Sequence, residues 1–235
     1  MGWGEMIAFV GSEATGKSTI LNEIGIWMGQ THRVRRIHAG KPPSTVLTFV
    51  PHFLLPALRA LFPEQRSLRV GARNEKTSGA AEEVYPLMFG LRSVMLAYER
   101  RALITRALAW SADGTIVLSD RYPSCGNRAL DGPQLSQFRA DSSQGSLRRW
   151  LASLEAHLYH DIPPPDVVIQ LTAPLEVTLA RNAARDKKEP EEYVRFRHSL
   201  SSNLQFIGAV VHHVDTDRPL EAVVRDVKEA IQNTL

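Results

Sequence analysis

The sequence predicts an α/β fold of three layers, in which a parallel sheet lies between helices. Five short apolar runs alternate with helical segments along the 235 residues, and this alternation is typical of doubly wound sheets. Two of the runs, Ile116-Val117-Leu118 and Val167-Val168-Ile169, are continuous in aliphatic residues, as in strands covered on both faces. A glycine-containing turn follows the first run directly and indicates a junction between a strand and a helix.

The five strands and the helices between them are predicted as follows. The apolar runs predict strands at 6–10, 34–39, 115–119, 166–171 and 209–215. Helical periodicity predicts helices at 17–29, about 83–111, 147–159, 174–185, 191–207 and 219–234. Within the second of these helices, spacings compatible with one buried face link Leu91, Val94, Tyr98, Thr105 and Leu108.

Residues 45–82 do not fit the alternation and are predicted to be an insertion, helical in part, after the second strand. Its apolar part, 45–62, contains two prolines and an arginine and is too short to span a bilayer comfortably. Three interpretations stay open: a hydrophobic cover over a substrate site or the core, a peripheral contact with a membrane or lipid substrate, and a dimer surface.

Composition narrows the class of protein. The 28 basic and 25 acidic side chains give a formal charge of +3, a mild balance from which we expect no binding to nucleic acid. Cys125 is the sole cysteine, which excludes an intrachain disulfide and suits a reducing compartment.

Because the first strand begins by residue 6, there is no room for a signal peptide, and we expect the protein to be cytoplasmic and to form one domain over 1–235.

The turn after the first strand carries a phosphate-binding pattern. Residues 11–19 read Gly11-Ser12-Glu13-Ala14-Thr15-Gly16-Lys17-Ser18-Thr19, which matches G-x-x-x-x-G-K-[ST]. In this pattern backbone N–H groups surround the phosphates, Lys17 reaches the β- and γ-phosphates, and the Ser18 hydroxyl ligates Mg²⁺. The helix that follows directs its positive dipole end at the same anion. The sequence therefore predicts a site for ATP and Mg²⁺.

A second cluster follows the third predicted strand, where the chain reads Asp120-Arg121-Tyr122-Pro123. A carboxylate at a strand end beside a phosphate loop is suited to hold Mg²⁺ through water or to accept a proton. The adjacent arginine is suited to bind an acceptor phosphate or the transferred phosphoryl group. The histidines, by contrast, have no metal-ligand spacing with Cys125.

With these motifs the chain resembles the thymidylate kinase family and its relatives among nucleoside and nucleotide kinases. The resemblance covers most of the chain except 45–82. It rests on the phosphate loop, Asp120-Arg121-Tyr122, residues 165–171 with 174–177 and Arg181, and residues 214–221. It implies a five-stranded parallel sheet and transfer of the γ-phosphoryl group of ATP, with Mg²⁺, to a nucleoside monophosphate-like acceptor. Homodimers are common in that family.

The resemblance also implies roles for residues. The residues expected to act in catalysis are Lys17, Asp120, Arg121 and Arg185. The residues expected to contact the acceptor are Glu13, Arg121, Tyr122 and either Arg92 or Arg100. Residues 181–192 correspond to a mobile lid, with Arg181 beside the adenine. Because Ala14 stands where some members carry an arginine, Arg185 or Lys188 would supply that charge. If the helix after Pro174 continues, Arg181, Arg185 and Lys188 lie on one face.

The acceptor is left open by two departures from the family. Its Glu-Pro-Gly-Gly-Thr segment is replaced here by residues 37–45, and Cys125 stands where many members have serine. One alternative is therefore a kinase that acts on a sugar, glycan or lipid-linked hydroxyl. Another is an ATP-binding switch with little transfer activity. A GTP-binding version of such a switch is disfavoured, because the sequence contains no guanine-selecting Asn-Lys-x-Asp.

Overall fold

The computed structural model describes residues 4–43, 87–124, 131–141 and 145–234. These residues divide into two compact units, the first drawn from 1–41, 104–132 and 163–235, and the second from 42–103 and 133–162. The predicted insertion at 45–82 and Cys125 lie outside the described residues. Of the helices in the described part, none is long and apolar enough to cross a membrane.

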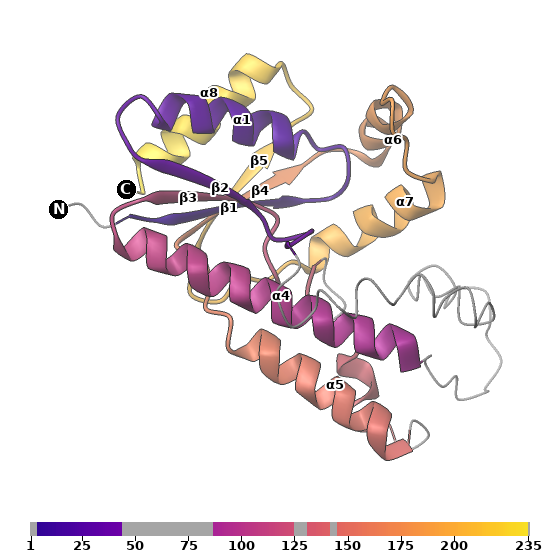
Figure 1. Cartoon of the computed structure of the whole chain (residues 1–235). Helices are drawn as coiled ribbons and strands as arrows, with labels where there is room; N and C mark the ends of the chain where they lie inside the picture. The colour runs from indigo at the N-terminus through magenta and orange to yellow at the C-terminus, as the bar shows by residue number, and fades with distance from the viewer. Residues whose placement is uncertain (1–3, 44–86, 125–130, 142–144, 235) are drawn as a thin grey trace. The chain divides into compact units, whose positions relative to one another are not determined.

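The first unit is built on a sheet of five parallel strands in the order β2-β3-β1-β4-β5 (Figure 1). The strands are β1 (Met6–Gly11), β2 (Val34–His38), β3 (Ile116–Asp120), β4 (Val167–Thr172) and β5 (Val210–Asp215). Helices flank the sheet, so the predicted α/β fold with a five-stranded parallel sheet is confirmed. Every residue of β1 is buried, as its continuous apolar sequence predicts.

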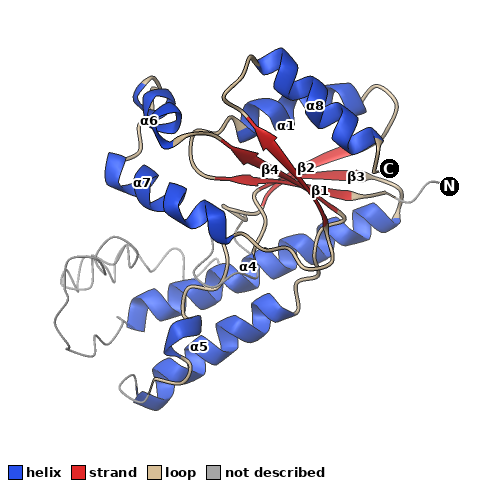
Figure 2. Ribbon diagram, turned by 180° about the vertical axis from the view of Figure 1, so that it is seen from behind, coloured by secondary structure: helices blue, strands red, loops and turns tan. Residues whose placement is uncertain are grey.

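Two helices, α1 (Lys17–Met28) and α8 (Leu220–Gln232), pack together on one face of the sheet. Figure 2 shows them above the strands, while the last turns of α4 (Leu87–Ala112) from Ile104 onward lie on the opposite face. The core on the α1 and α8 side is mainly aliphatic and contains Ile24, Ile169 and Val227, each fully buried. Burial of this apolar surface fixes the ends of the strands relative to α1.

The strand order reverses at β1. The chain passes from β1 to β2 and β3 on one side of the sheet and then to β4 and β5 on the other. In the register, Phe9 pairs with Asp120 of β3 and Gly11 pairs with Leu171 of β4. Open parallel sheets bind ligands at such a reversal, beyond the carboxyl ends of the strands. The loops after β1 and β3 therefore emerge side by side.

The helices after β4 are shorter than the sequence predicted. Helix α6 (Leu175–Ala183) ends before Arg185, so the expected helical face of Arg181, Arg185 and Lys188 is wrong. The Asn182 side chain closes the following loop, because its amide nitrogen donates to Glu189 O over 2.8 Å and its oxygen accepts from Glu189 N over 3.1 Å. The two bonds give the backbone N–H and C=O of Glu189 the hydrogen-bond partners that a continued helix would otherwise provide.

Helix α7 (Glu191–Ser199) passes into a 3₁₀ turn, η4 (Leu200–Asn203), where the sequence predicted helix to residue 207. The serines explain the early end, since Ser199 Oγ donates to Phe196 O over 2.9 Å and Ser201 Oγ donates to His198 O over 2.6 Å. Serine side chains compete in this way with the backbone hydrogen bonds of a helix.

The second unit contains α4 up to Leu103, the 3₁₀ turn η2 (Ser136–Phe138) and α5 (Gly145–His160). Its apolar cluster centres on Leu135 and Leu151. The carboxylate of Glu155, fully buried, accepts from the backbone N–H groups of Gln134 and Leu135 at 3.0 and 2.7 Å. Burial nevertheless raises the pKa of Glu155, so these hydrogen bonds hold a carboxyl group that is costly to ionise.

Candidate functional site

The phosphate loop connects the end of β1 to the start of α1. Gly11 has φ of 141° and Gly16, at the amino end of α1, has φ of 87°, conformations that glycine adopts at little cost. A side chain at Gly11 would also overlap Leu171 O. The motif's glycines are thus required by the path of the chain, and the loop ends at a helix amino terminus suited to anions.

Lys17 lies inside this loop. Its Nζ donates to Gly11 O over 3.2 Å, to Ser12 O, and to Thr15 Oγ1 over 3.4 Å. Burial, followed by the nearby charge of Arg121, lowers the pKa of Lys17 to about 8. The ammonium group is therefore held by neutral oxygens in a setting that disfavours its charge, and a polyphosphate would relieve that penalty.

Ser18 and Asp120 join the two sequence motifs. Ser18, in the first turn of α1, donates from Oγ to Oδ2 of Asp120 at the end of β3 over 2.9 Å. A hydroxyl and a carboxylate in this arrangement supply the oxygen ligands that Mg²⁺ prefers. The described residues contain no group of three or more His, Cys, Asp or Glu that could hold a metal, so remaining ligands would be phosphate oxygens and water.

Arg121 has an unusual backbone conformation for a non-glycine residue, with φ of 71°. Two hydrogen bonds fix it: Arg121 N donates to Phe9 O over 2.9 Å, and Ser119 Oγ donates to Arg121 O over 2.6 Å. Beside the side chain lies Gly40, where a Cβ atom would overlap Arg121 Cδ. A sparsely populated conformation held this firmly is typical of functional residues.

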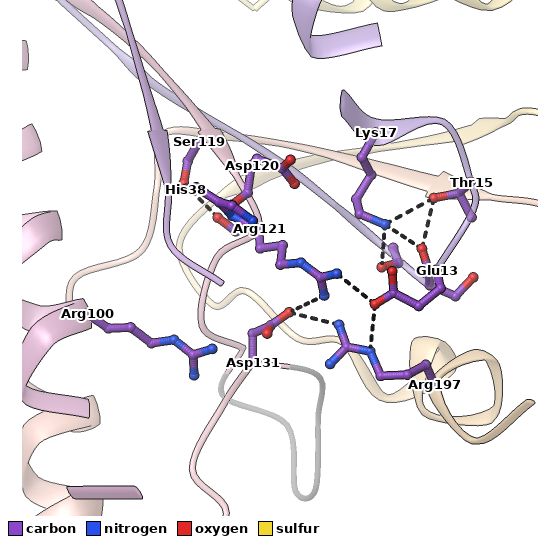
Figure 3. A network of polar contacts seen from close by, with 12 residues as sticks. Glu13, Thr15, Lys17, His38, Arg100, Ser119, Asp120, Arg121, Asp131 and Arg197 are labelled. Atoms are coloured by element: carbon purple, nitrogen blue, oxygen red, sulfur yellow. Dashed lines mark hydrogen bonds and ion pairs between the residues drawn. The ribbon is translucent and has the colours of Figure 1, made fainter. Parts of the chain in front are cut away.

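Four charged side chains form a closed square next to the phosphate loop (Figure 3). Glu13 Oε1 lies 2.6 Å from an Arg121 terminal nitrogen and 3.3 Å from Arg197 Nε. Asp131 Oδ2 lies 3.2 Å from a terminal nitrogen of each arginine. The four side chains are only 10–17% exposed. We call Glu13, Arg121, Asp131 and Arg197 the charge square.

The charge square sets the ionisation of Glu13. Burial alone raises the pKa of this carboxyl group, but Arg121 and Lys17, with a smaller contribution from Arg185, outweigh burial and hold the pKa below its ordinary value. Glu13 is therefore a carboxylate at neutral pH, and it accepts from Arg121 in a charge-assisted hydrogen bond.

A cavity of about 310 Å³ borders the phosphate loop. Its lining includes Thr15 and Gly16 of the loop, Arg181 and Arg185 from and after α6, and Thr216 after β5. Arg181 donates to Thr216 O over 2.8 Å and so is fixed against the cavity wall. The dimensions and lining suit a nucleoside attached to phosphates bound by the loop.

The remaining predicted residues have other surroundings. Tyr122 is buried, and its hydroxyl donates to Pro163 O over 2.6 Å. Arg92 and Arg100 belong to the second unit. Arg92 is exposed, whereas Arg100 is 3% exposed and donates to the Tyr159 hydroxyl over 2.6 Å.

Two members of the charge square, Asp131 and Arg197, were not anticipated from the sequence. Asp131 begins a turn with φ of 61°, and the Asp-Gly-Pro sequence that follows from it signals only a turn. Arg197 stands in a helix that contains a second arginine two residues earlier, and nothing in the sequence distinguishes the two.

Comparisons with known proteins add no assignment. No model of a protein family matches the chain, and no curated protein matches its sequence significantly. The functional proposal therefore rests on the residues themselves.

Proposed function

We propose that this protein is an ATP- and Mg²⁺-dependent small-molecule kinase with a P-loop kinase fold, which transfers a phosphoryl group to a nucleoside monophosphate-like acceptor. The observation that carries the proposal is the hydrogen bond between Ser18 and Asp120. It unites a phosphate loop with a carboxylate from another strand at the reversal of the sheet. A loop without such a partner would serve a binding protein equally well.

The donor side would be formed by the loop, α1 and the 310 Å³ cavity. Backbone N–H groups and Lys17 would bind the β- and γ-phosphates, and Arg181 would lie against the nucleoside. Ser18 and Asp120 would hold Mg²⁺, which supplies charge neutralisation at the phosphates when bound. Arg185 lines the same cavity and would place a further positive charge beside the bound phosphates.

The acceptor side would be formed by Glu13 and Arg121. In the reaction the bond between the γ-phosphorus and the β,γ-bridging oxygen breaks, and a bond forms between that phosphorus and an acceptor oxygen. Such transfer depends mostly on positioning and charge neutralisation. Arg121 is suited to both because Phe9 O holds its backbone and Glu13 holds its guanidinium group, while Gly40 leaves room for its side chain.

The test is ADP release measured with Mg²⁺-ATP against nucleosides, nucleoside monophosphates, sugars, glycans and lipid-linked alcohols. We expect acceleration by a nucleoside monophosphate. Turnover with a sugar, glycan or lipid-linked hydroxyl alone would replace the acceptor class but keep the kinase. ATP binding with no acceleration by any acceptor would contradict the kinase and favour an ATP-binding switch.

A further inference from the structure

The charge square contains more binding capacity than its own members use. Each guanidinium carries five N–H donors. Arg121 donates through two nitrogens, to Glu13 and Asp131, and Arg197 donates through one, to Asp131. Among the described residues no group accepts a hydrogen bond from the buried Nε of Arg197, although Glu13 Oε1 is 3.3 Å away. Buried donors in this condition are rare in proteins and call for an acceptor.

Asp131 occupies the position that an anion would take between the two arginines. One of its oxygens, Oδ2, is 3.2 Å from Arg121 and 3.2 Å from Arg197. A phosphate oxygen binds two guanidinium groups in the same way. Asp131 comes from a turn rather than from a strand or helix, so its displacement would not require a strand of the sheet to move.

Arg197 is distinguished from its neighbour by its surroundings. The Arg197 side chain is 10% exposed and contacts both carboxylates of the square. Arg195, on the same helix, is 51% exposed and pairs with Glu191 four residues earlier. An exposed ion pair such as Arg195 with Glu191 contributes little to stability or binding. Arg197 is instead held beside the phosphate loop through Glu13.

We propose that Arg197, together with Arg121, binds the anionic group of the acceptor, and that Asp131 is a resident carboxylate which this anion displaces. The proposal rests on the proposed function in taking the square as the acceptor side of a kinase. It adds a second arginine and a competing carboxylate to that side. The chemical group recognised is a phosphate monoester or a group of the same charge and geometry.

Inorganic phosphate is the probe, titrated calorimetrically into Lys17→Ala protein, in which the phosphate loop has lost its cation. We expect phosphate to bind at millimolar or lower concentration. Adding Arg197→Lys should weaken this binding about tenfold or more, because lysine cannot reproduce the planar, forked geometry of arginine. Arg195→Lys is the matched control and should leave the affinity unchanged. The conservative change retains the positive charge, and thermal unfolding verifies the fold.

Asp131→Asn gives a result that a structural role would not produce. Because the change removes a carboxylate that competes for the same two guanidinium groups, phosphate should bind several-fold more tightly. Asp113→Asn serves as the control, because Asp113 is an exposed residue directly after α4. Unchanged or weaker phosphate binding in Asp131→Asn would overturn the displacement, and equal binding with and without Arg197→Lys would overturn the arginine pair. No phosphate binding by the Lys17→Ala protein would overturn both.

These outcomes are independent of turnover. If ADP release identifies an acceptor, Arg197→Lys should raise its KM about tenfold or more while the KM for ATP stays constant. If no acceptor supports turnover but phosphate still binds through Arg197, the kinase fails and the anion site stands. If turnover is found but Arg197→Lys changes neither phosphate binding nor the acceptor KM, the kinase stands and the anion site fails.

Discussion

Ser18 and Asp120, separated by 102 residues, are joined by a hydrogen bond of 2.9 Å from Ser18 Oγ to Asp120 Oδ2. The contact depends on parallel pairing of β1 with β3, which brings the ends of both strands to the same edge. This edge of the sheet therefore brings the phosphate loop and the Asp120-Arg121 segment together.

Asp120→Asn should lower turnover far more than it weakens ATP binding. The amide retains the size of the side chain but loses the charge that would hold Mg²⁺ during transfer. Steady-state kinetics and calorimetry with ATP separate the two effects. Asp113→Asn is the matched control, and an equal loss of ATP affinity and turnover in Asp120→Asn would indicate a structural role instead.

Lys17→Ala should abolish turnover while the fold persists. Among the described residues, the Lys17 side chain donates to oxygens of its own loop alone, so its removal should leave the sheet and core intact. ADP release and circular dichroism provide the two measurements. Arg225→Ala, which removes an exposed charge from α8, should retain activity. Full activity of Lys17→Ala would refute the assignment of the phosphate loop.

ATP binding should be accompanied by proton uptake between about pH 8 and 9. Burial and Arg121 lower the pKa of Lys17 to about 8 in the free protein, and bound phosphates would raise it, so a partly neutral lysine must gain a proton. Calorimetry in two buffers of different ionisation enthalpy measures the uptake. Lys17→Arg keeps the charge but does not titrate in this range, so the uptake should vanish; identical apparent enthalpies for the wild type would contradict the prediction.

Glu13→Gln should flatten the loss of stability in acid. Although burial raises the pKa of Glu13, Arg121 and Lys17 lower it below the ordinary value of 4.5. A lowered pKa in the folded state stabilises the protein above the pKa of the unfolded chain, and this stabilisation is lost as the pH falls through the folded value. Melting temperatures from about pH 7 down to pH 3 should fall more steeply for wild type than for Glu13→Gln. The exposed control Glu191→Gln should follow the wild type; parallel curves for all three would exclude the effect.

Gly40→Ala should lower turnover by roughly tenfold or more and leave ATP binding unchanged. The added Cβ would overlap Arg121 Cδ and force the guanidinium away from Glu13. Kinetics with the identified acceptor would test this. Lys41→Ala changes the adjacent exposed residue and should behave as wild type, whereas an unaffected Gly40→Ala would mean that the position of Arg121 is unimportant.

Features that depend on local pattern were predictable from the sequence. The strands β1, β3 and β4 were identifiable because buried parallel strands are continuous in aliphatic residues. The edge strands β2 and β5 contain charged or histidine residues and are mostly exposed or half-buried, so their shorter apolar patterns located them less directly. The glycines at 11 and 16 identified the loop because its backbone conformations require them. The proximity of Ser18 and Asp120 then follows from the order of the strands.

Features that depend on long-range partners were not predictable. Nothing near Arg197 in the sequence marks it as different from Arg195, since burial of Arg197 depends on Glu13 and Asp131, which are distant along the chain. The end of α6 was missed for a related reason, because Asn182 closes the following loop through Glu189 only once that loop has folded.

The central position of β1 also has a consequence for synthesis on the ribosome. Phe9 pairs with Asp120 on one side and with Ile169 on the other, so β1 has no sheet partner until residues far along the chain have been translated. At ordinary rates of translation that interval is on the order of ten seconds. During it an entirely apolar segment, Met6–Gly11, has no sheet in which to bury its side chains, and such exposed segments are prone to aggregation. Because these pairings join distant parts of the chain, we expect the sheet to be completed late, and the phosphate loop to acquire its shape with it.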